Sequence, residues 1–415
     1  MARYGIPRTL NLDNHTGDAF GRLRVSEPHT LFDSKLLGLD DQPLFWDEQL
    51  ESGAGITAST PTAAQPYIDY TSTDSTAGVF TRQTFRRFNY QPGKSHLILM
   101  TGVLDLSGGG TGVERRIGYF DDNNGLFFED DAGTVGVTVR TNDSGSPVDT
   151  TVTQANWDDP MDGTGMSGLT IDWTASHIFV IDFQWLGVGR IRFGLEIDGV
   201  LYVVHAVSQS NSAAIPWAST PCLPLRYQMV TTGSSPVSTM RCICSAVISE
   251  GGQDELGVLH HKGTRGAHVV MNTENTLYAL QGIRLKSTHL GTTVKIIKTA
   301  IALFSASDDI EWILIFDPTI AGSPSWTGLT NSSVEYFNGA VANTVTGGTH
   351  IDGGWVSTGA GASAAGGDSE HVANALLLGS AIDGTPQTIV LCASPVNGSE
   401  TNVFAEGAII FREII

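Results

Sequence analysis

Positive charge is scarce in this sequence. Lysine and arginine together number 23, against 43 aspartates and glutamates, which gives a net charge of −20. Charged residues of both signs make up 16% of the chain, compared with about 25% in typical soluble domains. A surface with this balance repels phosphate backbones and anionic lipid headgroups. We therefore expect no nucleic acid among the partners and no insertion into a membrane.

Long hydrophobic runs are also missing. No segment approaches the roughly 18 consecutive apolar residues that a transmembrane helix needs. The first residues, MARYGIPRTLNLDN, contain no apolar stretch of the kind found in secretory signals. These two observations predict a protein that is made in a cytoplasm and is soluble there.

Cysteine is rare, with Cys222, Cys242, Cys244 and Cys392 as its four occurrences. Cys242 and Cys244 are two residues apart in MRCICSAVIS, so a strand would place both on one side. A zinc ribbon needs a second pair of this kind, which the sequence lacks. The pattern favours buried free thiols over a disulfide framework. We expect neither a bound metal nor another cofactor.

Helical periodicity is scarce as well, whereas alternating apolar and β-branched runs recur with turn signals between them. The 48 glycines fit many tight turns between short strands. The prediction is an all-β fold, with an N-terminal extended arm followed by two antiparallel β-sandwiches, the first of them jelly-roll or concanavalin-like. We assign the arm to 1–45, the first sandwich to 46–250, a linker to 251–267 and the second sandwich to 268–415.

Two dipeptides predict hairpins in the first sandwich. Asn124–Gly125 and Asp198–Gly199 both suit the positive φ angles of tight primed turns. The second dipeptide lies in a three-stranded antiparallel meander that we place at about 178–186, 189–197 and 200–207.

Acidic residues gather in two loops, where calcium binding or paired-carboxylate glycosidase chemistry has to be considered. In the first loop the twelfth position from Asp121 is Ala132, so the EF-hand spacing fails. The carboxylates of the second loop, Asp158, Asp159 and Asp162, are expected to cap backbone amides. Nucleophile elbows, HExxH and phosphate-binding loops are missing. We expect no catalytic residues and no enzyme activity, and calcium binding by an acidic loop stays open.

Tryptophans lie in or next to several of the expected strands of the first sandwich. Exposed rings on a β-sandwich can stack on sugars, but burial in a core or interface is the commoner fate of tryptophan. The core interpretation is favoured, and the alternative, a glycan platform, has Trp157 and Trp217 as its candidates.

Blocks spread over almost the whole chain resemble a known family. They read, in order, GDAFGRLRVSEPHTLFDSK from Gly17, IGYFDDNNGLFFE, GLTIDWTASHIFVIDFQWLGVGRIRFGLEIDG, PCLPLRYQM, LYALQGIRLKST and GAIIFREII. In these blocks the chain is similar to virion structural proteins of tailed bacteriophages that are associated with the tail or baseplate. The resemblance implies a structural role in the virion, with other virion proteins as partners and no assigned catalytic residues. A homo-oligomer is expected, most readily a trimer.

Three alternatives stay open beside a tail, baseplate or fibre subunit. The first is a receptor-binding fibre or spike head that recognises a host-surface glycan. The second is a capsid decoration or head-fibre protein, and the third is a glycan-degrading enzyme.

The N-terminal arm mixes charge with large apolar residues, which is not the composition of a free linker. In DAFGRLRVS, arginines alternate with apolar residues, as in a short strand added to the edge of a neighbour's sheet. The predicted docking residues of the arm are Phe20, Arg22, Leu23, Arg24, Val25, Leu31 and Phe32.

Two basic pairs, Arg86–Arg87 and Arg115–Arg116, stand out in this acidic chain. Arginine is favoured at interfaces, so these pairs could meet carboxylates of another subunit. Pairing within the chain is an equal alternative.

Overall fold

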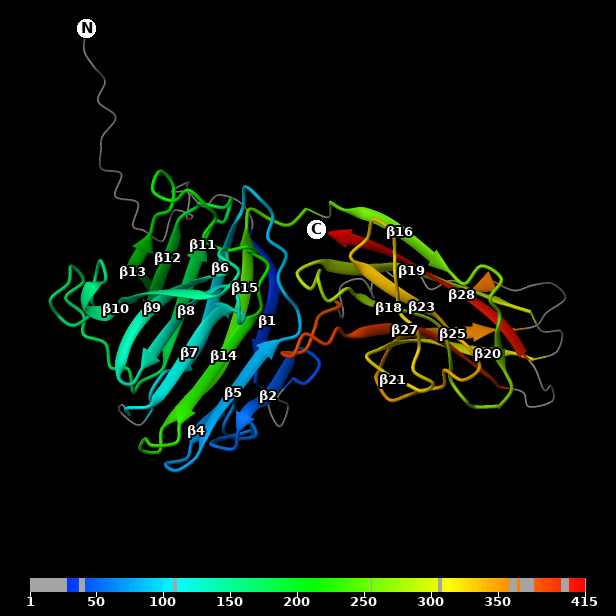
Figure 1. Cartoon of the computed structure of the whole chain (residues 1–415), viewed down its shortest axis with the longest axis horizontal. Helices are drawn as coiled ribbons and strands as arrows, with labels where there is room; N and C mark the ends of the chain where they lie inside the picture. Colours follow the sequence, from blue (N-terminus) through cyan, green and yellow to red (C-terminus); the bar gives the residue numbers. More distant parts are fainter. Residues whose placement is uncertain are drawn as a thin grey trace, which may run out of the picture. The chain divides into compact units, whose positions relative to one another are not determined.

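The structure is a computed structural model that describes residues 28–36, 42–106, 110–254, 256–304, 308–357, 364–365, 377–396 and 403–414 (Figure 1). Apart from one 3-10 turn, η1 (Gln154–Asn156), its regular elements are strands, and every strand pair is antiparallel. Among the described residues no helix has the length and hydropathy of a membrane span. The prediction of an all-β fold is confirmed.

The chain forms two compact units. The first comprises residues 1–84 and 90–254, and the second comprises 85–89 and 255–415. The short segment 85–89 therefore leaves the first unit between two of its strands and belongs to the second. There the backbone amide of Ser380 donates to the carbonyl of Phe85 (2.9 Å), and the side-chain amide of Asn89 donates to the carbonyl of Ile414 (3.4 Å).

The first unit contains an eight-stranded sheet. Strand β15 (Thr239–Glu250) is its longest strand and pairs along one side with β6. On its other side β15 pairs first with β4 and then with β1 (His29–Lys35). The remaining strands, in spatial order, are β13 (Val200–Val207), β12 (Ile191–Ile197), β11 (His177–Phe183), β6 (Ser95–Val103), then β4 (Ile68–Ser72) and β3 (Ile56–Ala58) beyond β15.

The second sheet of this unit has seven strands. In spatial order they are β10 (Val148–Thr153), β9 (Thr134–Thr141), β8 (Gly125–Asp131), β7 (Val113–Phe120), β14 (Leu225–Thr232), β5 (Ala77–Thr84) and β2 (Trp46–Gly53).

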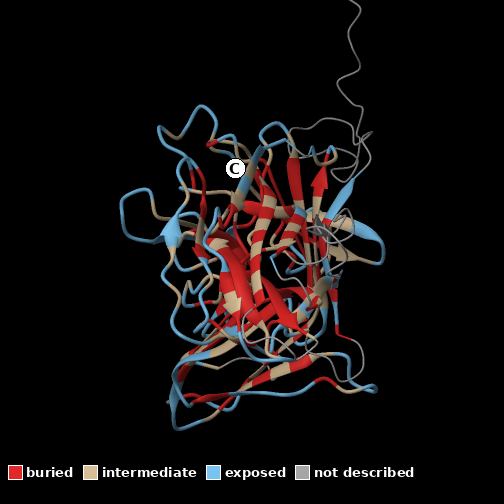
Figure 2. Ribbon diagram, turned by 90° about the vertical axis from the view of Figure 1, so that its right-hand side faces the viewer, coloured by how far each residue is buried: buried red, intermediate tan, exposed pale blue. Residues whose placement is uncertain are grey.

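Aromatic side chains join the two sheets into a sandwich. The Phe128 ring of β8 lies 5.1 Å from that of Phe179 on β11 and 5.5 Å from that of Phe193 on β12, measured between centroids. All three rings are buried, and each aromatic side chain buried in this way contributes strongly to stability. Figure 2 shows the result as bands of buried and less buried residues that alternate along many strands.

A charged cluster lies inside this sandwich. Arg115 on β7 faces the interior, fully buried, and its guanidinium forms ion pairs with Asp130 (2.6 Å) and Asp105 (3.2 Å). It also donates a hydrogen bond to the Ser238 hydroxyl. The next residue, Arg116, points to the opposite face and pairs with Glu129 and Glu114. For this basic pair the structure shows pairing within the chain.

The second unit is built from a five-stranded and a six-stranded sheet. The first holds β16 (Val258–Gly263), β28 (Val403–Ile414), β19 (Thr293–Leu303), β26 (Ala364–Ala365) and, also on β28, β17 (Val269–Met271). The second holds β22 (Thr327–Gly328), β23 (Val334–Asn338), β18 (Tyr278–Leu285), β27 (Thr388–Pro395), β20 (Ile310–Phe316) and β25 (Thr349–Val356).

Buried residues from both of these sheets form one apolar core, with Ile409 and Phe411 of β28 against Leu280 and Leu314 of the other sheet. A second, smaller cluster, which includes Ile313 and Phe337, is formed from further buried residues of this unit. One of its members, Val345, belongs to a separate two-stranded element formed by β21 (Thr319–Ile320) and β24 (Val345–Thr346).

The predicted meander is confirmed: β11, β12 and β13 are consecutive neighbours in the sheet. Asp198 and Gly199 have φ angles of 53° and 81°, as a primed turn requires. The prediction for Asn124–Gly125 is wrong in detail. A hairpin does join β7 to β8, but Asn124 does not have a positive φ, and the Asp121 carboxylate closes the turn by accepting from the backbone amides of Asn123 and Asn124.

The predicted linker 251–267 is a second correction, because it contains strand β16, which pairs with β28 over six residues. Of the predicted arm, Leu31 and Phe32 lie in β1 and are buried against the chain's own sheet. The other arm residues, Phe20, Arg22, Leu23, Arg24 and Val25, lie outside the described residues. The four cysteines are free thiols, as expected, with Cys242 and Cys392 buried.

Candidate functional site

Polar side chains cover one face of the seven-stranded sheet. They occupy alternate positions of neighbouring strands, opposite to the face that carries Phe128, because successive residues of a strand point to opposite sides. Pairing register places Arg116 beside both Gln228 and Glu129, and Thr138 beside Thr151. We call this surface the polar face; its residues are Thr81, Gln83, Arg116, Glu129, Thr138, Arg140, Asp149, Thr151, Arg226 and Gln228.

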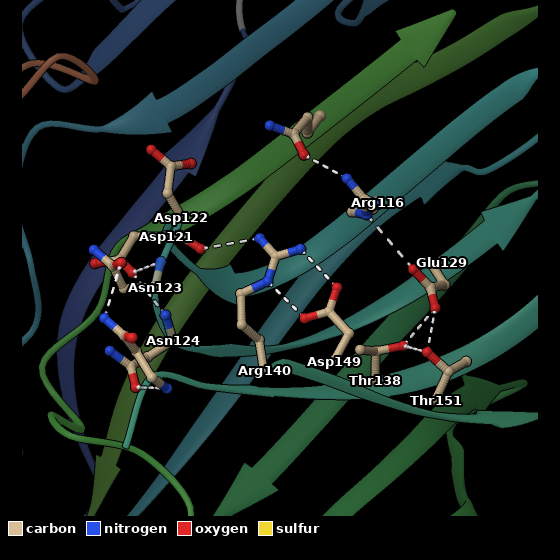
Figure 3. Close-up of polar contacts among 12 residues, drawn as sticks. Arg116, Asp121, Asp122, Asn123, Asn124, Glu129, Thr138, Arg140, Asp149 and Thr151 are labelled. Atoms are coloured by element: carbon tan, nitrogen blue, oxygen red, sulfur yellow. Dashed lines mark hydrogen bonds and ion pairs between the residues drawn. The ribbon is translucent and has the colours of Figure 1, made fainter. Parts of the chain in front are cut away.

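One hydrogen-bonded chain crosses the polar face from β10 to β5, and Figure 3 shows the part of it that joins Thr151, Thr138, Glu129 and Arg116. The Glu129 carboxylate accepts from the hydroxyls of Thr138 (2.6 Å) and Thr151 (2.7 Å) and from Nε of Arg116 (3.5 Å). Arg116 donates to Oε1 of Gln228 (2.9 Å), and Nε2 of Gln228 donates to the Thr81 hydroxyl (3.0 Å). The continuous chain fixes the orientation of each side chain in it.

Two further ion pairs flank this chain. The Arg140 guanidinium donates to both carboxylate oxygens of Asp149 (2.7 and 2.8 Å), a bidentate geometry that holds both groups in one plane. Burial acts to lower the pKa of Arg140, but the hydrogen bonds and charge of Asp149 outweigh it, so the pKa lies above its usual value. Arg226 pairs with Asp122 and donates to Oε1 of Gln83 (2.9 Å).

A groove of about 460 Å³ opens among these side chains. Guanidinium, carboxylate and amide groups from Arg116, Arg140, Asp149 and Gln228 line it, with Pro147 and two valines at its sides. The Phe127 ring lies beneath, 5.2 Å from the Arg140 guanidinium carbon and 5.8 Å from that of Arg116. Such a surface offers planar donors and acceptors to a polar ligand.

Two carboxyl groups outside this groove have a raised pKa. Burial raises the pKa of Asp130, which lies on the interior side of the same sheet beside Arg115. Burial also raises the pKa of Asp317, which belongs to the second unit. Glu129 and Asp149 of the polar face are bound to cations or hydroxyls of that face.

The first acidic loop is spread over different environments. Asp121 closes the β7–β8 turn, Asp122 pairs with Arg226, and Glu129 and Asp130 point to opposite faces of β8. Among the residues that the structure describes, no three histidine, cysteine or acidic side chains converge as metal ligands would. In the second loop, Asp159 accepts from the backbone amide of Ser167 (2.8 Å), which confirms the predicted capping of amides.

Trp157 and Trp217 are core residues, as the favoured interpretation of the sequence predicts. Trp157 and Trp217 are each 4% exposed. The Trp157 ring packs edge-on against Phe128 with centroids 6.3 Å apart, and Trp217 packs against Phe183 at 5.8 Å. A sugar cannot stack on a ring that other side chains cover, so the platform proposed at these two residues is wrong. The exposed tryptophan is Trp355 on β25, 64% exposed. Its sequence context carries no signal that distinguishes it from the other tryptophans.

Comparison with known proteins gives a fold likeness only. No family model and no curated protein matches the chain. Among solved structures, it is similar to a Bacillus licheniformis β-glucanase (12% identity, 54% of this chain and 98% of that chain, TM-score 0.33) and to peanut lectin (11%, 54% and 98%, 0.30). It is also similar to the CBM2 module of the evolved Dit protein of Lactobacillus casei BL23 phage J-1 (11%, 55% and 98%, 0.34). Identities and scores this low carry no argument about activity or ligands.

Proposed function

We propose that this chain is a non-enzymatic structural subunit of a tailed-phage virion, within the tail, baseplate or fibre assembly. The resemblance of its sequence blocks to virion proteins is the starting point. The observation that supports the proposal most directly is strand β1, the last part of the predicted arm. It pairs with β15 from His29 to Lys35, with a bulge between Thr30 and Phe32, and among the described residues β15 is its one partner strand.

A strand at the edge of a sheet is a template for pairing with another chain. The segment that precedes β1 contains the alternating sequence from Phe20 to Val25, which suits the same kind of pairing with a neighbouring subunit. Assembly through strand addition needs no catalytic group. The acids of the polar face are already bound by neighbouring side chains of that face, which is consistent with such a role.

Deletion of residues 1–27 tests this role. Because the deletion keeps β1, we expect the purified protein to retain its melting temperature, while its incorporation into particles, measured by immunoblot of purified virions, falls at least tenfold. A deletion of residues 1–16, which keeps the block from Gly17 onward, serves as the control and should be incorporated normally. Normal incorporation of the longer deletion would show that the arm has no docking role.

The oligomer and its position on the particle need separate experiments. We propose a homotrimer, whose mass light scattering would measure directly; a monomer would mean that partner proteins drive assembly. Immunogold labelling of virions separates a tail or baseplate subunit from a capsid decoration protein. Release of reducing ends from host polysaccharide would contradict a non-enzymatic role.

Glycan recognition is a second candidate function, favoured by the groove of the polar face. Its fixed guanidinium, carboxylate and amide groups are of the types that bind sugar hydroxyls. Binding on a glycan array that is lost in an Arg140→Ala variant would support a receptor-binding fibre or spike head. Unchanged binding in that variant would place recognition elsewhere.

A further inference from the structure

A second cavity, of about 440 Å³, opens in the first unit at the side of the sandwich. It is lined by residues of β9, β10 and β13 and by the loop that follows β13, up to Trp217. Its β9 residues, Val137, Val139 and Thr141, alternate with Thr138 and Arg140 of the polar face and so point to the other side of the sheet. The cavity and the groove are therefore separate sites.

The walls of the cavity are mostly aliphatic. Val137, Val139 and Trp217 are buried in its floor, and Ile215, 55% exposed, stands at its rim. Burying a sugar hydroxyl against such a floor without a partner is unfavourable, whereas burying a methyl group is favourable. The size lies within the range of small-molecule sites.

Polar groups around the cavity define the charge that it accepts. Asp143, Ser208 and Gln209 line it, and no lysine or arginine is among its lining residues. His205, which also lines it, lies 3.3 Å from the carboxylate of Asp158 through Nδ1. With carboxylates nearby and a net charge of −20 on the chain, an anionic ligand is disfavoured.

Three buried polar atoms of its lining residues make no hydrogen bond to any described residue: Nε1 of Trp217, Oγ1 of Thr141 and Nδ1 of His205. The last of these faces Asp158, so the first two have unused hydrogen-bonding capacity. A buried donor without a partner is costly, so a group that satisfies it gains affinity. Both atoms are shielded from solvent, so a ligand in the cavity reaches them only with a side-chain adjustment of the kind common on binding.

We propose that this cavity binds a neutral acetamido sugar, such as an N-acetylglucosamine unit of a cell-surface glycan. The acetamido methyl packs on the valine floor, and its carbonyl accepts from the indole N–H of Trp217 or the hydroxyl of Thr141. The ring hydroxyls face Asp143 and Gln209. This inference does not rest on the virion role or on the polar groove.

The test compares N,N′-diacetylchitobiose with cellobiose, which lacks the acetamido groups, by calorimetry on the full chain. We expect the acetylated disaccharide to bind at least tenfold more tightly. Ala213→Trp fills the cavity and should abolish binding, whereas Ala214→Trp, at the neighbouring exposed residue outside the lining, should leave it unchanged. Melting temperatures verify that both variants fold.

A third variant keeps the test decisive if Ala213→Trp does not fold. Trp217→Phe keeps a ring but removes the indole N–H, and we expect it to weaken chitobiose binding at least fivefold. No binding to the unmodified chain, equal affinity for the two disaccharides, or equal binding by the Ala213→Trp and Ala214→Trp proteins would overturn the proposal. The proposal would also be overturned if Arg140→Ala lost binding while Ala213→Trp kept it, because that result assigns the sugar to the groove.

Discussion

An Arg115→Met variant is expected to lose about 3–5 kcal/mol of unfolding free energy, the usual cost of removing one partner from a buried ion pair. The substitution leaves the carboxylates of Asp130 and Asp105 inside the sandwich without their guanidinium. The loss corresponds to a fall of roughly 6–20 °C in melting temperature for a unit of this size. Thermal and urea unfolding measure it.

The same variant should respond to pH in a defined direction. Burial already raises the pKa of Asp130 and the charge of Arg115 opposes this rise, so removing Arg115 raises the pKa further. The folded variant then holds a proton that the unfolded chain has released, and its stability falls as pH rises. We expect the deficit relative to the parent protein to shrink from pH 7 to pH 5.

A matched control is the more exposed ion pair of Arg241 with Asp69, which has bidentate geometry at 2.7 and 2.9 Å. Arg241→Met should cost only about 1 kcal/mol or less, because solvent screens the pair. Adding Asp130→Asn to Arg115→Met should recover part of the loss. If Arg115→Met unfolds no earlier than Arg241→Met, the buried cluster is not what stabilises this sandwich.

A Trp217→Ala variant should lower the melting temperature by roughly 6–20 °C, which corresponds to about 3–5 kcal/mol for truncating a buried tryptophan. The ring fills space against Phe183 and is nearly inaccessible, so its removal leaves a cavity that the neighbours only partly fill. Differential scanning calorimetry measures the change. Ile215→Ala, an exposed residue of the same loop, should change stability by no more than about 0.5 kcal/mol. An unchanged melting temperature for Trp217→Ala would show that the ring is not part of the core.

The strands were predictable from sequence where their patterns are local. Strand β28 alternates buried and half-buried residues along most of its length, and the meander carries its own turn signal at Asp198–Gly199. Failures arose where a distant partner decides the outcome. Strand β16 reads as a polar linker, and only pairing with β28, about 150 residues away in sequence, makes it a strand.

The polar face could not be predicted for the same physical reason. Arg116 and Glu129 are close in sequence, but Gln228 and Thr81 join them only through the register of three strand pairs. The acidic residues of 121–131 are evident in the sequence. Their separation onto two faces of the sheet, however, depends on which residues of β8 face the core. The burial of Trp157 and Trp217, in contrast, was predictable, because most tryptophans in folded proteins are largely buried.

The insertion of 85–89 into the second unit bears on the order in which the nascent chain can fold. Asn89 reaches its acceptor, the carbonyl of Ile414, across 325 residues of sequence. At a synthesis rate of about 5–20 residues per second, roughly 15–65 s separate the emergence of the two partners. Phe88, which is fully buried in the finished protein, spends that interval without its native surroundings. The strands of the first unit are all translated long before the last strand of the second, so 85–89 is the part of this region that reaches its native contacts last.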